Sequence, residues 1–256
     1  GLSNEIPYGV NTKSIVTIHD LLFLKYPNYY NYIDRKIYYL KSKFACKKSS
    51  HIIATSKQTK EDIIRFFKIK ESKIHVIYQS CDDKFIYPSN HEIKDETLKK
   101  QTNKPYILYV GRIEERKNLL FLLKAMNKTQ KEVHLICVGN KTKYYKKIHQ
   151  YISINKLQNR ITFMNVNNTK TLSFLYRKSR GLVFPSLDEG FGIPIIEGMY
   201  SKIPVVTSNK AIFKEIGGKS SYYFEENNID SLVQEISEIW TNSSEREKRI
   251  QLNLKY

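Results

Sequence analysis

Residues 184–198 read FPSLDEGFGIPIIEG, and this stretch predicts an open α/β sheet with a ligand site at its edge. The apolar run that ends at Phe184 predicts a buried strand, and a helix is expected near Pro194, because proline is favoured at the first helical position. Between them, Gly190 and Gly192 allow the backbone to approach a ligand closely and to direct N–H groups at an anion. Ligands of open α/β sheets bind at this end of the parallel strands.

Two carboxylates flank these glycines, Glu189 just before them and Glu197 in the expected helix. A site for bare phosphate would not favour them, because like charges at close range cost free energy. An ionised glutamate accepts hydrogen bonds from hydroxyl groups, each worth on the order of 1.5–3 kcal/mol. A nucleotide sugar carries hydroxyls beside its phosphates and therefore suits this turn. The alternative is a glycine-rich turn with two solvated acids at the start of a helix.

A second charged turn follows another apolar run, where residues 109–118 read YVGRIEERKN. Arg112 and Lys117 could neutralise a diphosphate, the arginine as a planar fork and the lysine as a point charge. The alternative is a solvated charged loop. That alternative accounts well for three residues, Glu114, Glu115 and Arg116.

A third candidate lies in residues 16–21, which read VTIHDL. His19 ends the first apolar run, where a buried imidazole could hydrogen-bond a substrate hydroxyl. A lone histidine in such a position is more often structural, and Asp20 could simply orient it. Both interpretations stay open at this point.

Short apolar runs alternate with longer periodic segments, which is typical of βαβ units on a parallel sheet. The predicted strands span residues 14–18, 51–54, 74–77, 106–110, 133–138, 181–184 and 203–207. The predicted helices span residues 30–47, 57–67, 119–127, 144–155, 170–178, 194–200 and 230–240. Ser56 is a suitable N-cap for the helix expected from residue 57.

A polar segment separates two strand-bearing blocks of the chain. Residues 88–105 are rich in Lys, Asp, Glu, Asn and Thr, so we predict a linker over residues 89–104. This places a first domain at residues 1–88 and a second at residues 105–256. Three predicted strands precede the linker, which is too few for a complete doubly wound domain.

The formal net charge of +18 favours an anionic partner. The lysines are nevertheless spread along the chain, and no DNA- or RNA-recognition motif is present, so a nucleic-acid partner is not expected. Residues 29–48 interleave Tyr and Phe with Lys and Arg. This suits either a helix on an anionic membrane surface or a core-packed helix whose lysines reach solvent. A basic module that binds a membrane surface or a nucleic acid is therefore the alternative from a different class.

Metal and disulfide chemistry find no support in the sequence. The three cysteines are too few and too far apart for a disulfide framework or a zinc site, and the six histidines lack metal-ligand spacing. No D-x-D pair is present to hold a divalent cation beside a sugar nucleotide. Cys137, in the apolar run 133–138, is interpreted as a small core residue. No apolar run reaches the roughly eighteen residues of a membrane-spanning helix, and a reducing cytoplasm fits the cysteine content.

Taken in order, these strings resemble glycosyltransferase family 4, a large family of retaining GT-B glycosyltransferases. The resemblance extends over nearly the whole chain. Besides the glutamate-flanked turn, it rests on GLSNEIP at 1–7, TIHD at 17–20, ATSKQTKEDI at 54–63, VGR at 110–112, KN at 117–118 and PVV at 204–206.

The resemblance implies two Rossmann-like domains that face a cleft, with parallel sheets covered by helices on both faces. It implies that Arg112 and Lys117 hold the donor diphosphate and that Glu197 binds the ribose hydroxyls. Glu189 and the backbone of residues 190–192 would meet the transferred sugar, as would His19 from the N-terminal domain. The expected catalytic residues are His19, Arg112, Lys117 and Glu189. The expected donor-binding residues are Gly111, Arg112, Lys117, Ser186, Glu189, Gly190, Phe191, Gly192 and Glu197.

The activity that the resemblance implies is metal-independent transfer of a hexose from a nucleotide sugar, with retention. The donor favoured is GDP-mannose, and the acceptor expected is a glycan or a lipid-linked glycan in cell-surface polysaccharide biosynthesis. Another GT-B enzyme, a sugar-nucleotide epimerase or a phosphorylase, is the alternative within the fold. We expect a cytoplasmic protein that can lie at the inner face of the membrane.

The family normally has further residues before the position of Gly1 and further helices after that of Tyr256. The chain therefore resembles an internal fragment with an incomplete N-terminal domain. We expect weak or absent turnover from it, although donor binding could persist.

Overall fold

The computed structural model describes residues 4–9, 11–87 and 96–253. The chain divides into two compact units, Gly1–Ser80 with Asp188–Gly192 and Cys81–Leu187 with Ile193–Tyr256. The predicted linker 89–104 stays a prediction, because residues 89–95 lie outside the described residues. A short helix, α5 (Glu96–Gln101), occupies part of its remainder.

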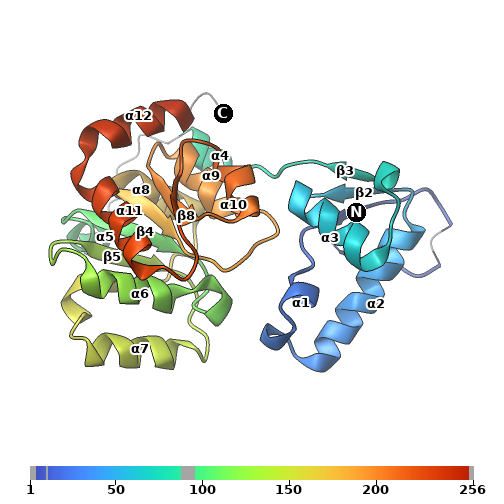
Figure 1. Cartoon of the computed structure of the whole chain (residues 1–256), viewed down its shortest axis with the longest axis horizontal. Helices are drawn as coiled ribbons and strands as arrows, with labels where there is room; N and C mark the ends of the chain where they lie inside the picture. Colours follow the sequence, from blue (N-terminus) through green and yellow to red (C-terminus); the bar gives the residue numbers. More distant parts are fainter. Residues whose placement is uncertain (1–3, 10, 88–95, 254–256) are drawn as a thin grey trace. The chain divides into compact units, whose positions relative to one another are not determined.

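The first unit contains a parallel sheet with the strand order β1-β2-β3. Figure 1 labels its strands β2 and β3. These strands are β1 (Ile15–Ile18), β2 (His51–Ala54) and β3 (Ile74–Val76). Its helices are α1 (Leu22–Lys25), α2 (Tyr32–Lys48) and α3 (Lys57–Phe67), with short 3-10 turns at Pro27–Tyr29 and Glu71–Lys73. Ser56 caps α3 as predicted, since its side chain accepts a hydrogen bond from the Thr59 N–H at 3.0 Å.

The core of this unit follows the two-residue period of the strands. Val16, Ile52 and Ile74 are paired neighbours across the sheet, and all three are buried in one apolar cluster. Cys46 of α2 and Ile63 of α3 belong to the same cluster. Both helices therefore pack on the same face of the smaller sheet.

The second unit contains a six-stranded sheet with the order β6-β5-β4-β7-β8-β9, in which every neighbouring pair is parallel. The strands are β4 (Tyr106–Val110), β5 (His134–Val138), β6 (Ile161–Met164), β7 (Gly181–Phe184), β8 (Val205–Ser208) and β9 (Tyr222–Phe224). The chain runs outward from β4 through β5 to β6 and then returns to place β7 on the other side of β4. The strand order therefore reverses between β4 and β7, which is where such sheets bind ligands.

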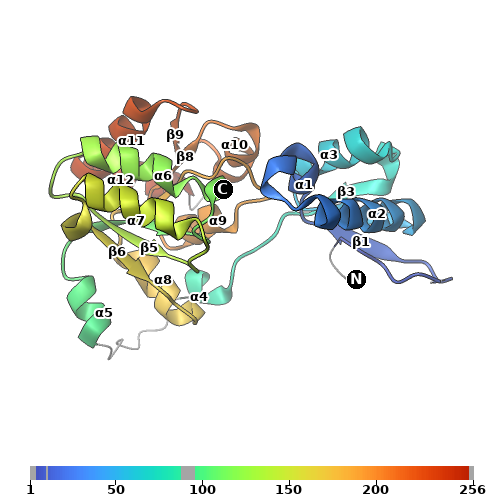
Figure 2. The ribbon, with the colours of Figure 1, turned by 90° about the horizontal axis from the view of Figure 1, so that it is seen from below.

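Helices cover both faces of this larger sheet. One face carries α6 (Leu119–Lys128), α7 (Tyr145–Ile154) and α11 (Ile229–Thr241), and the other carries α8 (Thr169–Lys178), α9 (Ile193–Tyr200) and α10 (Ala211–Gly217). Figure 2 shows α6 and α7 on one side of β5 and β6 and α8 on the other. The remaining helices of the unit are α4 (Asp83–Ile86), α5 and α12 (Ser243–Asn253).

Alternate strand residues serve the two faces. In β4, Tyr109 joins the apolar cluster with α6 and α11, whereas the hydroxyl of Tyr106 donates to the Leu175 carbonyl of α8 at 2.8 Å. Cys137 is fully buried in the first cluster, and burial raises the pKa of its thiol, which confirms it as a core residue. Within the described parts of the chain, no helix combines the length and hydropathy needed to cross a bilayer.

All seven predicted strands are present within two residues of their predicted ends. The two strands that the sequence did not predict, β6 and β9, are the edge strands of the larger sheet. β6 has one buried residue of four, and β9 has only three residues, so neither shows the longer buried run of β4 and β7. Among the described residues, five helices were not predicted either, namely the short α1, α4 and α5 and the longer α10 and α12.

Candidate functional site

The turns after β4 and β7 lie side by side at the point where the strand order reverses. The Leu187 N–H donates to the Arg116 carbonyl at 2.9 Å, and the Ser186 hydroxyl lies 3.5 Å from the same oxygen. Ser186 is buried at this junction. The two stretches that the sequence analysis singled out separately are thus joined by hydrogen bonds within the second unit.

Lys117 lies over the carboxyl ends of both strands. A Cβ built on Gly111 would be 3.6 Å from Lys117 Cδ, so the lysine side chain passes directly over that glycine. Its ammonium nitrogen is 5.6 Å from the centre of the Phe184 ring, at the end of β7. This places a positive charge where the strand order reverses.

Arg112 is the more open cation of this turn. Its side chain is 67% exposed, and its Nε lies 3.7 Å from the Glu114 carboxylate. A guanidinium in this position is accessible to an incoming anion, to which it offers a planar fork of donors. Arg112 and Lys117 together form the cationic half of the candidate site.

The structure differs from the sequence-based interpretation at Arg116. A solvated surface position was the alternative given for Glu114, Glu115 and Arg116, and Glu115 is indeed exposed. The Arg116 side chain, however, is only 13% exposed and its Nη2 lies 3.2 Å from Glu114 Oε1. Arg116 is therefore a structural residue, because its carbonyl also receives the hydrogen bonds that join the two turns.

Gly139, which the sequence analysis did not single out, is required by close backbone packing. A Cβ on Gly139 would lie 2.0 Å from the Gly111 carbonyl oxygen. Any side chain there would displace the turn that carries Arg112 and Lys117. No local pattern predicts this requirement, since Gly139 simply follows an apolar run.

Glu197 is held by a buried tyrosine. The Tyr176 hydroxyl of α8 donates to Glu197 Oε2 at 2.7 Å, and Tyr176 is fully buried. Phe85 packs edge-on against the Tyr176 ring, with centroids 5.3 Å apart. Burial raises the pKa of Glu197, the Tyr176 hydrogen bond opposes this rise, and the nearby negative charge of Asp82 adds to it. The sequence did not predict the role of Tyr176, because no local pattern links it to Glu197, which is 21 residues further along the chain.

Residues 188–192 belong to the first unit, where Asp188 anchors them. Asp188 is buried, and its Oδ2 accepts hydrogen bonds from the Lys25 ammonium at 2.5 Å and the Tyr26 hydroxyl at 3.1 Å. Its Oδ1 accepts the Glu189 N–H at 2.8 Å. A second carboxylate, Asp62, lies 3.7 Å from the same ammonium. Burial raises the pKa of Asp62 to about 6, the Lys25 charge opposes this rise and the Asp188 charge adds to it.

Glycine is required at positions 190 and 192 for two different structural reasons. A Cβ on Gly190 would lie 1.9 Å from the His19 carbonyl oxygen, so this position excludes a side chain by packing. The Gly190 carbonyl also accepts a hydrogen bond from the Ser56 hydroxyl at 2.7 Å. Gly192 instead has a φ of 106°, in the region that favours glycine. Between them, Phe191 is buried, with its ring centroid 6.0 Å from that of Tyr78.

His19 has a different ring partner from the one expected. Its Nδ1 lies 3.2 Å from the Gln79 side-chain nitrogen. Asp20 instead accepts the Leu22 N–H at 3.1 Å, within the turn that leads into α1. Gln79 is thus a ring partner of His19 that the sequence did not predict.

The predicted site residues fall into two groups. The second unit brings together the cationic turn, Ser186 and the buried end of β7, and it carries Glu197 on α9. The first unit brings His19 and residues 188–192 into contact. The residues that sequence reasoning missed are structural supports of these groups, namely Lys25, Gln79, Arg116, Gly139, Tyr176 and Asp188.

Two family models match almost all of the chain. The model described as glycosyl transferases group 1 matches residues 90–255, and the model described as glycosyltransferase family 4 matches residues 7–85. The chain belongs to the group 1 glycosyltransferases. The resemblance inferred from the sequence motifs is thereby confirmed.

Two relatives of the chain are O-antigen chain mannosyltransferases. The group 1 chain is 28% identical to the O-antigen chain mannosyltransferase RfbU of Salmonella typhimurium, covering 88% of the chain and 61% of the relative. It is 29% identical to O-antigen chain mannosyltransferase B of Escherichia coli, covering 92% of the chain and 63% of the relative. The chain thus spans about three fifths of the length of these relatives.

Solved structures identify the fold. The Anabaena protein Alr3699/HepE, in complex with UDP and glucose, aligns with a TM-score of 0.80 at 20% identity, covering 95% of this chain and 66% of that one. WaaG, a glycosyltransferase involved in lipopolysaccharide biosynthesis, aligns with a TM-score of 0.79 at 15% identity, covering 94% and 70%. These neighbours are GT-B glycosyltransferases, and the predicted α/β fold class of this group 1 chain is confirmed.

Proposed function

We propose that the protein containing this chain transfers a mannose-like hexose from a nucleotide sugar to a glycan or lipid-linked acceptor. The observation that carries the proposal is the junction of the two turns, where Lys117 lies over the ends of β4 and β7. The mannosyltransferase relatives from O-antigen synthesis support the sugar, and the donor favoured is GDP-mannose. Cell-surface polysaccharide biosynthesis is the proposed setting.

The donor diphosphate is assigned to Arg112 and Lys117, whose charges match it. Arginine binds phosphate oxygens as a fork, and lysine binds them as a point charge. The HepE neighbour was solved with UDP and glucose, which supports a nucleoside diphosphate as part of the donor. Gly111 lies in the same turn as the two cations, and Ser186 lines the same junction.

Glu197 is assigned to the ribose hydroxyls. A carboxylate accepts hydrogen bonds from hydroxyls, and the Tyr176 hydroxyl fixes the orientation of this one. Glu189, the backbone of Gly190 and Gly192, and His19 are assigned to the transferred sugar, with Phe191 as the apolar anchor of that segment.

The proposed reaction proceeds with retention and without a metal ion. Bond cleavage at the anomeric carbon leaves negative charge on the departing diphosphate, and Arg112 and Lys117 stabilise it as preorganised cations. The acceptor hydroxyl attacks from the same face and passes its proton to the departing phosphate. The proposed location is the cytoplasm, at the inner face of the membrane where lipid-linked acceptors are found.

The donor site is tested by thermal denaturation of the chain with GDP-mannose, UDP-glucose and the free nucleotides. A ligand at a hundred times its Kd adds about 2.7 kcal/mol to the free energy of unfolding. We expect GDP-mannose to give the largest shift and Glu197→Ala to abolish it. Glu132→Ala, which removes an exposed carboxylate before β5, is the matched control. An unchanged shift in Glu197→Ala would mean that the ribose site is misplaced.

The reaction class is tested on the full-length protein. Incubation with donor alone, followed by NMR of the sugar, separates transfer from the epimerase alternative within the fold. We expect no epimer to form, and an acceptor glycan to receive the sugar with its anomeric configuration unchanged. Rapid epimerisation without acceptor would contradict the proposal.

A further inference from the structure

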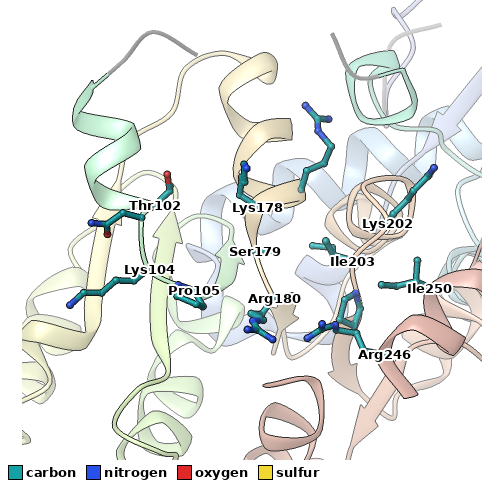
Figure 3. Close-up of a pocket in the computed structure, with 13 residues that line it drawn as sticks. Thr102, Lys104, Pro105, Lys178, Ser179, Arg180, Lys202, Ile203, Arg246 and Ile250 are labelled. Atoms are coloured by element: carbon teal, nitrogen blue, oxygen red, sulfur yellow. The ribbon is translucent and has the colours of Figure 1, made fainter. Parts of the chain in front are cut away.

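A second cluster of cations lines a cavity at the end of the larger sheet where its strands begin. The cavity, about 380 Å³ in volume, is lined by the segments that precede β4, β7 and β8 and by α12 (Figure 3). Lys104 comes just ahead of β4, and Arg180 stands directly before β7. The amino ends of parallel strands lie opposite their carboxyl ends. The cavity is therefore distinct from the candidate donor site.

The charge of this cavity has one sign. Six lining residues are cationic and none is acidic, and the six are Lys104, Arg177, Lys178, Arg180, Lys202 and Arg246. Within the described parts of the chain, none of the six forms an ion pair. Other cations of the protein do, such as Lys60 with Glu71 and Lys128 with Asp230. The positive charge of the cavity is thus left without a carboxylate partner there.

Neutral groups hold the three arginines in place. The Arg180 guanidinium lies 5.6 Å from the centre of the Trp240 ring. Arg246 Nη1 donates to the Ile239 carbonyl at 3.3 Å, and Arg177 Nη1 donates to the Lys84 carbonyl at 3.2 Å. These contacts position the guanidinium groups without neutralising them, and each keeps further N–H donors for a ligand.

Helix dipoles explain part of this charge. Arg177 and Lys178 end α8, and Lys202 follows the end of α9, where cations interact favourably with the helix carboxyl terminus. Lys104 and Arg180 precede strands and have no such role. The lining therefore carries more positive charge than the helix ends require.

We infer that this cavity binds a phosphate-bearing anion, the phosphate or diphosphate group of either a free solute or a lipid head group. Arginine forks and lysine point charges are the groups that proteins use for phosphate. The volume falls within the range of about 300–1,000 Å³ that is typical of small-molecule sites. The site lies at the other end of the sheet from the chemistry and stands independently of the proposed donor.

The test uses inorganic pyrophosphate and isothermal titration calorimetry. All proteins carry Arg112→Gln and Lys117→Gln, so that pyrophosphate does not occupy the donor site and the outcome is independent of that assignment. The cavity variant adds Lys178→Gln and Lys202→Gln, two exposed lysines whose loss leaves the core intact. We expect pyrophosphate to bind the parent, and the cavity variant to bind it at least about tenfold more weakly.

The matched control removes the same charge elsewhere. The control protein carries Lys124→Gln and Lys146→Gln. These two lysines are exposed on α6 and α7, in a different part of the same unit. The affinity of this control for pyrophosphate is expected to stay within about twofold of the parent. A second cavity variant, Lys104→Gln with Arg180→Gln, is expected to lose affinity as the first does. Equal loss in the control would show a general charge effect and overturn the proposal.

A vesicle-binding experiment distinguishes a free phosphate-bearing solute from a lipid head group. Sedimentation uses vesicles of about three parts phosphatidylcholine to one part phosphatidylglycerol at physiological salt. Binding of pyrophosphate without vesicles supports a free solute. Binding of vesicles that the cavity variant loses and the control keeps supports a lipid head group. Binding of neither probe by the parent overturns the inference.

Discussion

The Tyr176–Glu197 hydrogen bond gives the sharpest test of the site, through the substitution Tyr176→Phe. The hydroxyl donates to Glu197 Oε2 at 2.7 Å from a fully buried ring. A hydrogen bond to a charged group contributes about 1.5–3 kcal/mol, so its loss should lower the free energy of unfolding by that amount at neutral pH. The same loss removes the hydrogen bond that orients the Glu197 carboxylate. Donor affinity should then fall by about tenfold or more.

The pH dependence has a definite sign. Burial already raises the pKa of Glu197 above its usual value, and the Tyr176 hydrogen bond opposes that rise. Tyr176→Phe therefore raises this pKa further. A carboxyl with a raised folded pKa binds its proton more tightly in the folded state, so its contribution to stability falls as pH rises through the window above its unfolded pKa. The destabilisation by Tyr176→Phe should be larger at pH 7 than at pH 4, and the acidic limb of donor affinity should move to higher pH.

Tyr106→Phe is the matched control for this substitution. Its hydroxyl is also buried in the second unit, but it donates to the neutral Leu175 carbonyl at 2.8 Å. Tyr106→Phe should lower stability by about 1–3 kcal/mol at every pH and leave the pH profile of donor binding unchanged. Thermal denaturation with and without donor from pH 4 to 8 measures both effects. Identical pH profiles for Tyr176→Phe and the wild type would refute the assigned role of the tyrosine.

Three further predictions concern substitutions in the first unit. Gly190→Ala should lower the free energy of unfolding by about 3 kcal/mol or more, because the new Cβ meets the His19 carbonyl; a normal melting temperature would contradict this. Lys25→Met should cost about 3–5 kcal/mol by leaving Asp188 buried without its cation, as urea titration would measure. Asp62, whose pKa burial raises from 3.8 to about 6, loses about 3 kcal/mol of folded-state stabilisation as pH rises through that window. Asp62→Asn should therefore gain that amount relative to wild type between pH 4 and pH 7, and equal pH slopes would disprove it.

The inner strands of both sheets could be predicted from the sequence because they are covered by other elements. In β4 and β7, almost every residue is buried. Each strand is therefore an uninterrupted run of apolar residues, and the ends of the run mark the ends of the strand. The edge strands β6 and β9 lack that signal, and their pairing depends on partners far away in the chain. The short helix α10 was likewise too brief for its periodicity to be distinguished from a loop.

The charged residues of the candidate site have a local sequence pattern and stay predictions, whereas their structural supports have no such pattern. Arg112 and Lys117 follow the end of β4, and Glu197 lies within α9 next to Gly198, so in each case charge close to glycine indicates a ligand. Tyr176 and Gly139 contribute through contacts that only the folded chain creates. Long-range packing of this kind leaves no local pattern, which is also why Arg116 was interpreted as a solvated residue.

The stretch 184–198 combines two structural requirements that its sequence alone could not separate. Its strand end and helix belong to the second unit, whereas residues 188–192 belong to the first. Gly190 is excluded from bearing a side chain by the His19 carbonyl, and Gly192 is required by its φ of 106°. The glycine pair was interpreted as a device for approaching a ligand, but packing and backbone conformation already require both residues. The two glycines therefore do not by themselves indicate an anion site, and the proposed donor binding depends on Lys117, Arg112 and the tyrosine-held Glu197.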